Sequence, residues 1–313
     1  MKIIFMGTPE FAVPILEMLN QEHEVLLVVT QPDKEVGRKR VLTPSPVKLK
    51  AIELGLPIIQ PVKLKQDYAF LLSLNADFIV TAAYGQMLPN ELLDKIKAIN
   101  VHGSLLPAYR GGAPIQYALF DGLKETGVTI MYMAYKMDSG DIIKQEKLWI
   151  EDDDNYLTLA KKLSILGTKL LKEVLMDLSK GMIYHKMQDE SQITYAYTLK
   201  TQDEWIHFNE TTKHIINRIR GLSPQIGATA AIKNTTLKFY LAQKSDIIDD
   251  KAVPGTVLSV SKRLVIKTKD GSIEMLLVQA PGKKIMAVKD FLNGQNIIAL
   301  GDVFEEGSSS YGR

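Results

Sequence analysis

Residues 98–116 read AINVHGSLLPAYRGGAPIQ, an apolar strand-like run followed by a turn rich in Ser, Pro and Gly. Asn100 and His102 stand two positions apart at the end of that run. Because residues i and i+2 of a strand project from the same face, the amide and the imidazole are predicted to converge on one point. Loops that leave strand ends form the ligand sites of α/β sheets, so the stretch predicts both a sheet and a site.

The sequence on either side of this stretch alternates between strand and helix patterns. Apolar runs predict strands over 2–6, 24–30, 77–82, 99–102, 127–133 and 142–150. Helical spacing predicts helices over 11–19, 45–55, 113–120 and 155–180. This alternation is typical of an α/β fold, here a Rossmann-like domain with a mostly parallel sheet, which we place at residues 1–188.

A second, smaller domain is predicted after a polar segment without clear periodicity. We interpret residues 189–206 as a linker and residues 309–313 as a tail. Between them, at 207–308, a helix over 212–220 precedes five short strands, over 228–232, 237–242, 255–260, 264–268 and 272–278. The pair Asp270-Gly271 is a hairpin signal. Several short strands in about a hundred residues predict a small β-barrel, a fold that commonly binds nucleic acid.

A third polar group joins Asn100 and His102 as a candidate for catalysis. Asp138 lies in KMDSGDII, residues 136–143, after another apolar run. An amide and a protonated imidazole can donate hydrogen bonds to an oxyanion, and a carboxylate can orient the imidazole and help to remove a proton from an amine. The set suits acyl transfer to an amine, which needs no nucleophilic side chain. The chain contains no Cys, which excludes thiol catalysis and disulfides.

Other classes of function are disfavoured by motifs that the sequence lacks. The first strand is followed by GTPEF and not by GxGxxG, and there is no Walker A motif, which disfavours a dinucleotide or nucleotide enzyme. The five histidines show no metal-binding spacing, so no metal is expected. Apolar runs are too short for a secretory signal or a membrane span, so we expect a cytoplasmic protein without a membrane partner.

Positive charge is concentrated in two places. Residues 207–313 carry 15 Lys and Arg against 10 Asp and Glu, a net charge of +5, which leaves −3 for residues 1–206. Residues 31–50 hold six basic side chains against two acidic ones, namely Lys34, Arg38, Lys39, Arg40, Lys48 and Lys50. Such patches indicate either a polyanionic partner or a solvated surface. The position of the 31–50 loop, after the second strand, favours the partner.

Three segments carry a specific resemblance: NVHGSLLPAYRGGAPIQYAL at 100–119, GVTIMYM at 127–133 and MDSGDII at 137–143. Together they resemble the formyltransferases that use 10-formyltetrahydrofolate and, among these, the family that acts on methionyl-tRNA. The resemblance extends to residues 1–16, 31–48, 81–89 and 280–284 and so covers essentially the whole chain. It implies an OB-like second domain, initiator methionyl-tRNA as the partner, no DNA partner and a monomer.

The resemblance also implies roles for individual residues. Asn100 and His102 would stabilise the tetrahedral oxyanion, while Asp138 would hold His102 and assist removal of the amine proton. Groups around the folate are implied at Ser104, Leu105, Leu106, Pro107, Ala83, Tyr84, Gly85, Met87 and Leu88. Contacts with tRNA are implied at Arg38, Lys39, Arg40, Lys283 and Lys284.

Some features depart from the family, and other readings stay open. RGLSPQIGA at 220–228 replaces a region where relatives often carry tryptophans, and WIHFN at 205–209 replaces a more usual acidic-aromatic-Ser arrangement. A sugar-amine formyltransferase can share HGSLLP and a similar second domain, although it would not need the basic loop. A glycinamide-ribonucleotide formyltransferase should lack the second domain. A folate- or RNA-binding module without turnover is disfavoured by the three intact polar groups.

Overall fold

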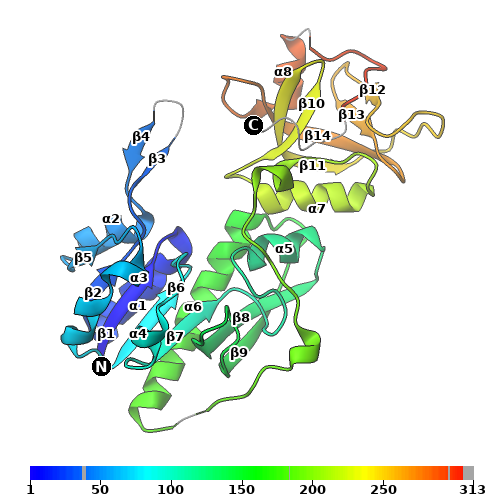
Figure 1. Ribbon diagram of the computed structural model, residues 1–313. Helices are drawn as coiled ribbons and strands as arrows, with labels where there is room; N and C mark the ends of the chain where they lie inside the picture. The colour runs from blue at the N-terminus through cyan, green and yellow to red at the C-terminus, as the bar shows by residue number, and fades with distance from the viewer. Residues whose placement is uncertain (37–39, 183, 295–296, 306–313) are drawn as a thin grey trace. The chain divides into compact units, whose positions relative to one another are not determined.

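The computed structural model describes residues 1–36, 40–182, 184–294 and 297–305, which form two compact units (Figure 1). The first unit comprises residues 1–114, 125–149 and 160–197. The second comprises 115–124, 150–159 and the described part of 198–313. The chain therefore passes between the units several times, and the predicted linker 189–206 is divided between them at residue 197.

A seven-stranded sheet forms the first unit, in the order β5-β2-β1-β6-β7-β8-β9. Its strands are β1 (Lys2–Gly7), β2 (Glu24–Val29), β5 (Ile58–Ile59), β6 (Phe78–Ala82), β7 (Ala98–His102), β8 (Glu125–Tyr132) and β9 (Ile142–Trp149). The first five strands in this order, β5-β2-β1-β6-β7, pair in parallel. Strand β8 pairs antiparallel with both β7 and β9. The predicted Rossmann-like, mostly parallel sheet is confirmed.

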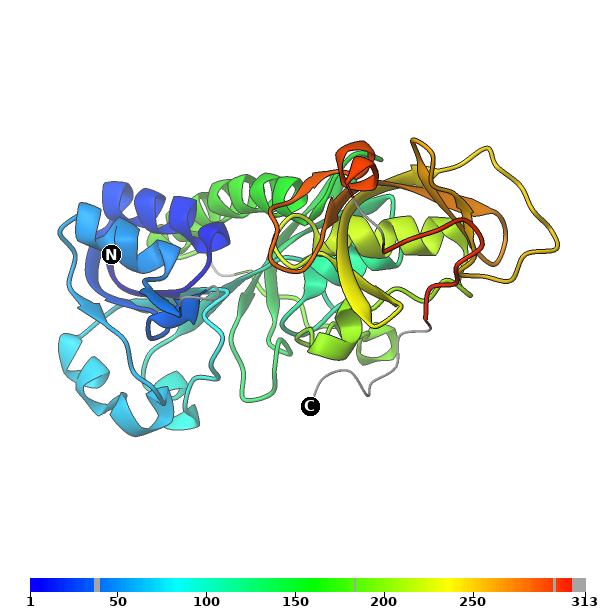
Figure 2. The same cartoon turned by 90° about the horizontal axis from the view of Figure 1, so that it is seen from above.

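Helices cover both faces of this sheet (Figures 1 and 2). On one face lie α1 (Val13–Glu22) and α6 (Tyr156–Ser179). A short 3-10 helix, η1 (Glu10–Ala12), directly precedes α1. Gly167 of α6 lies against Val101 and Val128, where a methyl group would approach the Val101 side chain to 2.8 Å. The other face packs Ile4 and Met6 with apolar side chains of α3 (Leu64–Asp67), η2 (Ala69–Leu74) and α4 (Asn90–Leu93).

The basic segment at 31–50 is more ordered than the predicted loop. Strands β3 (Lys34–Val36) and β4 (Val41–Thr43) form an antiparallel hairpin that projects from the first unit (Figure 1). Helix α2 (Pro46–Glu53) follows, and the Ser45 side chain accepts a hydrogen bond from the Lys48 N–H at its start. The helix predicted from the Ser-Pro pair is therefore confirmed.

The second unit is an antiparallel sheet in the order β10-β11-β14-β13-β12, with β15 beside β14. Its strands are β10 (Ala228–Ile232), β11 (Thr235–Lys244), β12 (Val257–Ser259), β13 (Leu264–Lys267), β14 (Ser272–Gln279) and β15 (Met286–Ala287). Its helical elements are α5 (Pro114–Phe120, shared with the first unit), η4 (Thr201–Glu204), α7 (Thr212–Leu222) and α8 (Val288–Asn293). All five predicted strands are present, and β13 and β14 form the predicted hairpin.

The seam of this curled sheet is covered by a segment late in the chain. Glu305 bridges Ala231 of β10, and Val303 bridges Thr256, which precedes β12. The Phe304 N–H donates to the Gly255 carbonyl at 2.9 Å, and the Phe304 ring packs against Phe208 and Phe239 in the apolar core. Residues 303–305 therefore join the two edges of the sheet, as an OB-like barrel requires.

Candidate active site

Strand β7 brings Asn100 and His102 to the same face, as their spacing predicts. Asn100 lies opposite Thr81 of the parallel neighbour β6, and His102 lies opposite Thr129 of the antiparallel neighbour β8. Asp138 is placed near them by the loop that joins β8 to β9. The three predicted catalytic residues thus come together in the first unit, at the end of β7 and the start of the loop after it.

The amide of Asn100 has a defined orientation. Its Oδ1 accepts a hydrogen bond from the Thr81 hydroxyl at 2.7 Å. Because an amide has one acceptor end and one donor end, this bond leaves the Nδ2 donor for a ligand. Thr81 is buried, so water does not compete with the bond. Asn100 is therefore prepared to donate to an oxyanion.

The imidazole of His102 is held by a backbone carbonyl. Its Nε2 lies 3.0 Å from the Tyr109 carbonyl oxygen, which can only accept, so the ring proton of the neutral form belongs on Nε2. The Nδ1 atom faces Asp138, 3.8 Å from Oδ2. That separation suits an ion pair but is too long for a hydrogen bond. Tyr109 therefore holds the ring at Nε2, and the role of Asp138 in holding His102 stays a prediction.

Asp138 adopts a strained backbone conformation with φ of 50°. Non-glycine residues seldom occupy this left-handed region, although Asp and Asn tolerate it best. Its Oδ2 accepts a hydrogen bond from the Gly111 N–H at 2.8 Å. The carboxylate side chain is 15% exposed, which leaves it accessible to a substrate group. In this conformation the carboxylate lies beside His102 and within hydrogen-bond distance of the 109–113 loop.

The predicted folate loop at 104–107 is anchored by side chains from two strands. The Thr129 hydroxyl donates to the Ser104 carbonyl at 2.6 Å and accepts from the Leu106 N–H at 3.1 Å. Gln145 of β9 donates to the Leu106 carbonyl and to Thr129, each at 2.8 Å. The Ser104 hydroxyl donates to the Ala108 carbonyl at 2.7 Å within the loop. Its polar groups are thus largely used to hold the loop.

Among the apolar residues of that loop, exposure separates two kinds. Leu106 is buried against Met131 and Ile142. Leu105 and Pro107 are only partly buried, so their side chains can contact a ligand. The loop after β6 shows the same division. Tyr84 and Leu88 belong to the core, whereas Ala83, Gly85 and Met87 are exposed.

Tyr84 is fixed by the protein itself. Its carbonyl accepts hydrogen bonds from the Thr8 hydroxyl at 3.0 Å and from Gln31 Nε2 at 3.1 Å. Burial raises the pKa of the Tyr84 phenol to about 12, so it stays neutral. Its hydroxyl has no hydrogen-bond partner among the described residues. The side chains of Tyr84 and Leu88 are buried, whereas Ala83, Gly85 and Met87 are exposed, and the folate contacts expected at all five stay a prediction.

The basic residues of the 31–50 segment are partly neutralised. Lys48 pairs with Asp33 at 2.6 Å, and Lys50 pairs with Glu17 and Glu53, which raises the pKa of Lys50. Arg40 is 80% exposed and lies 2.8 Å from Glu35, which is exposed as well. Arg38 and Lys39 lie outside the described residues. In the second unit, Lys283 and Lys284 are exposed on a turn.

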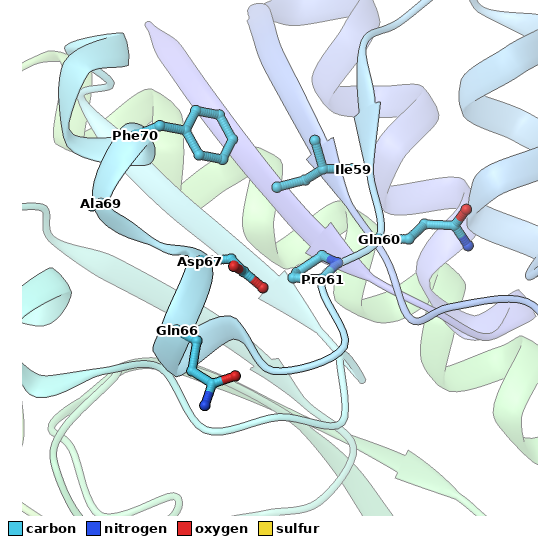
Figure 3. A pocket seen from close by; sticks show the side chains of 7 residues that line it. All are labelled: Ile59, Gln60, Pro61, Gln66, Asp67, Ala69 and Phe70. Atoms are coloured by element: carbon cyan, nitrogen blue, oxygen red, sulfur yellow. The ribbon is translucent and has the colours of Figure 1, made fainter.

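A separate cavity of about 520 Å³ lies beside β5 and the short helices α3 and η2 (Figure 3). It is lined by Ile59, Gln60, Pro61, Gln66, Asp67, Ala69 and Phe70. The predicted site residues do not line it. Within the described part of the chain, no cluster of His, Asp and Glu suits a metal ion, and no helix is long and apolar enough to span a membrane.

Several supporting residues were missed by the sequence analysis: Thr81, Tyr109, Arg110, Gly111, Thr129, Gln145 and Gln188. The pairing of β6 with β7 could have suggested Thr81, because parallel neighbours align at their carboxyl ends. Tyr109 lies seven residues after His102, and the others act across separations of 16 to 78 residues. Nothing local in the sequence marks those contacts.

Family models match both parts of the chain. A model described as formyl transferase matches residues 1–175, and one described as formyl transferase, C-terminal domain, matches residues 198–296. A methionyl-tRNA formyltransferase from Staphylococcus aureus (strain MW2) is 46% identical over 308 residues, which are 96% of this chain and 98% of that protein. One from Listeria innocua serovar 6a is 48% identical over 298 residues, 94% of this chain and 95% of that protein.

Solved structures share the fold at lower identity. An N-formyltransferase from Helicobacter canadensis, in complex with folinic acid and dTDP-3-aminofucose, has a TM-score of 0.66 at 19% identity and covers 90% of this chain and 99% of its own. HypX from Aquifex aeolicus, in complex with tetrahydrofolic acid, has a TM-score of 0.63 at 17% identity. It covers 93% of this chain, which spans 46% of the HypX chain. These likenesses concern the fold alone.

Proposed function

This chain belongs to the methionyl-tRNA formyltransferase family, and on that premise we propose that it formylates the free α-amine of initiator methionyl-tRNA. The formyl donor is 10-formyltetrahydrofolate, and the product, N-formylmethionyl-tRNA, serves translation initiation. The observation that carries the proposal is the convergence of Asn100, His102 and Asp138 on one site. These three kinds of side chain suit an enzyme that transfers an activated formyl group to an amine.

Asn100 and His102 act on the oxyanion. When the amine nitrogen bonds to the formyl carbon, the formyl oxygen gains negative charge. Asn100 donates to this oxygen through Nδ2, which Thr81 leaves free. Because the Tyr109 carbonyl occupies Nε2 of His102, Nδ1 is the atom that would carry the second proton and donate to the oxyanion. Alignment of the two substrates in one cleft supplies much of the remaining rate.

Asp138 acts on the proton. The attacking nitrogen becomes positively charged as it bonds to carbon, and it must lose a proton before the product forms. The carboxylate accepts this proton, directly or through a water molecule. The bond between the formyl carbon and N10 then breaks, and N10 takes up a proton as tetrahydrofolate leaves. The Gly111 N–H keeps the carboxylate in place through these steps.

The co-substrate fits the residues around this centre. Leu105, Pro107 and Met87 present exposed or partly exposed apolar surface for a flat ring. The backbone groups of Ala83 and Gly85, with those that the anchored 104–107 loop does not use to hold itself, are suited to bind polar ring atoms. We assign Ser104, Leu106, Tyr84 and Leu88 to the support of these surfaces, because their side chains are buried. No metal takes part in this scheme.

The macromolecular substrate is assigned to the basic positions. Arg38, Lys39 and Arg40, which lie between β3 and β4 in the sequence, and Lys283 and Lys284 of the second unit contact tRNA phosphates in this proposal. Structured RNA is held mainly through shape, phosphates and 2′-hydroxyls, so distributed charge suffices. The protein would act in the cytoplasm as a monomer, without a membrane or DNA partner.

One assay tests the proposal directly. The protein is incubated with 10-formyltetrahydrofolate and either initiator methionyl-tRNA or an aminosugar nucleotide, and the formylated product is measured. Transfer to methionyl-tRNA alone is the expected result. Transfer to the aminosugar nucleotide alone would establish the sugar-amine alternative. Folate binding without transfer to either amine would indicate a binding module.

Replacement of Thr81 tests how the oxyanion donor is oriented. In Thr81→Val the shape is kept but the hydroxyl that binds Asn100 Oδ1 is lost, so the amide can rotate. We expect kcat for formyl transfer to fall about tenfold, the effect of one misdirected hydrogen bond. Thr81→Ser keeps the hydroxyl and should restore most of the rate. Equal rates for Val and Ser variants would show that Asn100 needs no such support.

Removal of the basic side chains tests the tRNA assignment. The combined Arg38→Ala, Lys39→Ala, Arg40→Ala variant and the Lys283→Ala, Lys284→Ala variant should each bind methionyl-tRNA more weakly. The slope of log affinity against log salt should fall by about one unit for each phosphate that is no longer neutralised. Folate affinity should not change. Lys50→Ala, which removes a lysine paired with Glu17 and Glu53, is the matched control.

A further inference from the structure

A buried guanidinium lies close to the β8–β9 loop, which carries Asp138, and takes no part in the mechanism proposed above. Arg110 is only 4% exposed. Both its Nε and one terminal nitrogen donate to Oε1 of Gln188, at 3.0 and 2.7 Å. The terminal nitrogen also lies 3.2 Å from Glu190, whose carboxylate is 75% exposed. The buried cation thus directs its donors mainly at a neutral amide.

The guanidinium determines which way the Gln188 amide points. Because Arg110 has only donors, it selects the oxygen of the amide. The Nε2 group of Gln188 then points toward the β8–β9 loop, where it donates to the carbonyls of Asp138 and Gly140, each at 2.8 Å. One side chain therefore ties together two carbonyls on either side of Ser139.

Residues 186–196, which we call the strap, hold Gln188 in place at both ends. Lys186 exchanges two backbone hydrogen bonds with Ile142 at the start of β9. The Arg110 N–H donates to the Thr194 carbonyl at 2.9 Å, and the Ala196 N–H donates to the Arg110 carbonyl at 2.8 Å. The strap is thus fixed to both segments that meet at Asp138, namely the 109–113 loop and the β8–β9 loop.

The conformation that this arrangement supports is costly. A non-glycine residue with positive φ is strained, and it persists only where its surroundings determine it. Asp138 has φ of 50°, and Gly111 binds its carboxylate while Gln188 binds its carbonyl. Removal of the hydrogen bond from Gln188 to the Asp138 carbonyl would leave the backbone of Asp138 free to relax from this conformation.

We propose that Gln188, oriented by Arg110, is a positioning residue that keeps the Asp138 carboxylate in its productive place. The inference rests on the proposed function of Asp138 in proton removal. Gln188 does not touch the substrates in this account and acts only through the 138–140 backbone. Gln188, the last residue of the predicted first domain, therefore contributes to catalysis from the point where the predicted linker begins.

The test compares two Gln188 variants in formyl transfer to methionyl-tRNA. Gln188→Glu fills the same space and keeps oxygens toward Arg110 but has no donor for the two carbonyls. Gln188→Leu removes both ends. Each should lower kcat on the order of tenfold to a hundredfold, because a small misplacement of a catalytic group has effects of this size. The KM values for folate and tRNA should stay within about twofold, since neither substrate contacts Gln188.

A matched control and a double variant separate positioning from general damage. Gln192→Leu removes another amide of the strap and should keep the wild-type rate. The Nε2 of Gln192 donates to Asp189 and not to the β8–β9 loop. In an Asp138→Asn background, Gln188→Leu should cause no further loss, because the two residues act as one unit. Multiplicative losses would overturn the proposal, as would a kcat for Gln188→Leu within twofold of wild type.

Hydrogen exchange provides a readout without substrates. Amides of residues 136–141 should exchange faster in Gln188→Leu than in wild type, while those of β7 should not change. If the wild-type protein failed to formylate methionyl-tRNA, the proposed function would fail, and the exchange result would still decide whether Gln188 holds the loop. Unchanged exchange at 136–141 would reject the positioning role whatever the activity.

Discussion

Asp138→Asn is expected to lower the rate of formyl transfer on the order of a thousandfold or more. The replacement has the same size and tolerates the left-handed conformation at φ of 50° as well as Asp does. Its amide oxygen can still accept the Gly111 N–H. What disappears is the negative charge that accepts the proton of the amine and faces His102 at 3.8 Å. General base catalysis alone accounts for two to four orders of magnitude in rate, on the order of the loss expected here.

The measurement is single-turnover formyl transfer, with folate affinity and thermal unfolding recorded in parallel. Both of these should match the wild type, because shape and backbone are kept. Asp141→Asn, three positions later in the same loop and paired with the exposed His185, is the control and should stay active. An Asp138→Asn variant that retained most of its activity would show that the residue serves packing and not proton removal.

Loss of an oxyanion donor should cost a hundredfold or more in kcat. Asn100→Ala removes the Nδ2 donor, and Asn100→Asp keeps the oxygen that binds Thr81 but places a second acceptor where the donor was. Both variants should be nearly inactive while binding folate, and the aspartate variant should be at least as slow because its charge repels the oxyanion. Asn90→Ala, on the exposed start of α4, controls for loss of an amide elsewhere.

His102 requires a different choice of variant. Its side chain is 5% exposed, so alanine would open a cavity as well as remove a donor. His102→Gln fills more of the space and should keep the folded state while losing the cationic donor. A hundredfold fall in kcat with an unchanged unfolding temperature is the expected result. Near-normal turnover in that variant would remove His102 from the mechanism.

The sequence predicts most of the architecture because the relevant signals are local. Alternation of short apolar runs and helical spacing gives the parallel strands, and Asn100 and His102 share a face through the two-residue period of β7. The Ser45-Pro46 start of α2 follows from the chemistry of helix caps. Each of these features depends on residues that lie close together along the chain.

The supporting contacts could not be predicted in the same way. Gln188 reaches carbonyls about fifty residues earlier in the chain, and Thr129 and Gln145 reach back to the 104–107 loop. A polar side chain without periodicity looks like surface until its partners are known. Likewise, the sequence does not show that the side chains of Tyr84 and Leu88 are buried in the core.

The segment at 303–305 has a consequence for how the protein matures. A ribosome makes these residues after all the strands that they join, and domains generally fold in the order of their synthesis. The edges at β10 and Thr256 must therefore wait unpaired until this segment emerges. An exposed strand edge invites pairing with another chain. Nascent copies would thus be most prone to aggregate late in elongation, and a synthesis pause before residue 303 should increase the insoluble fraction.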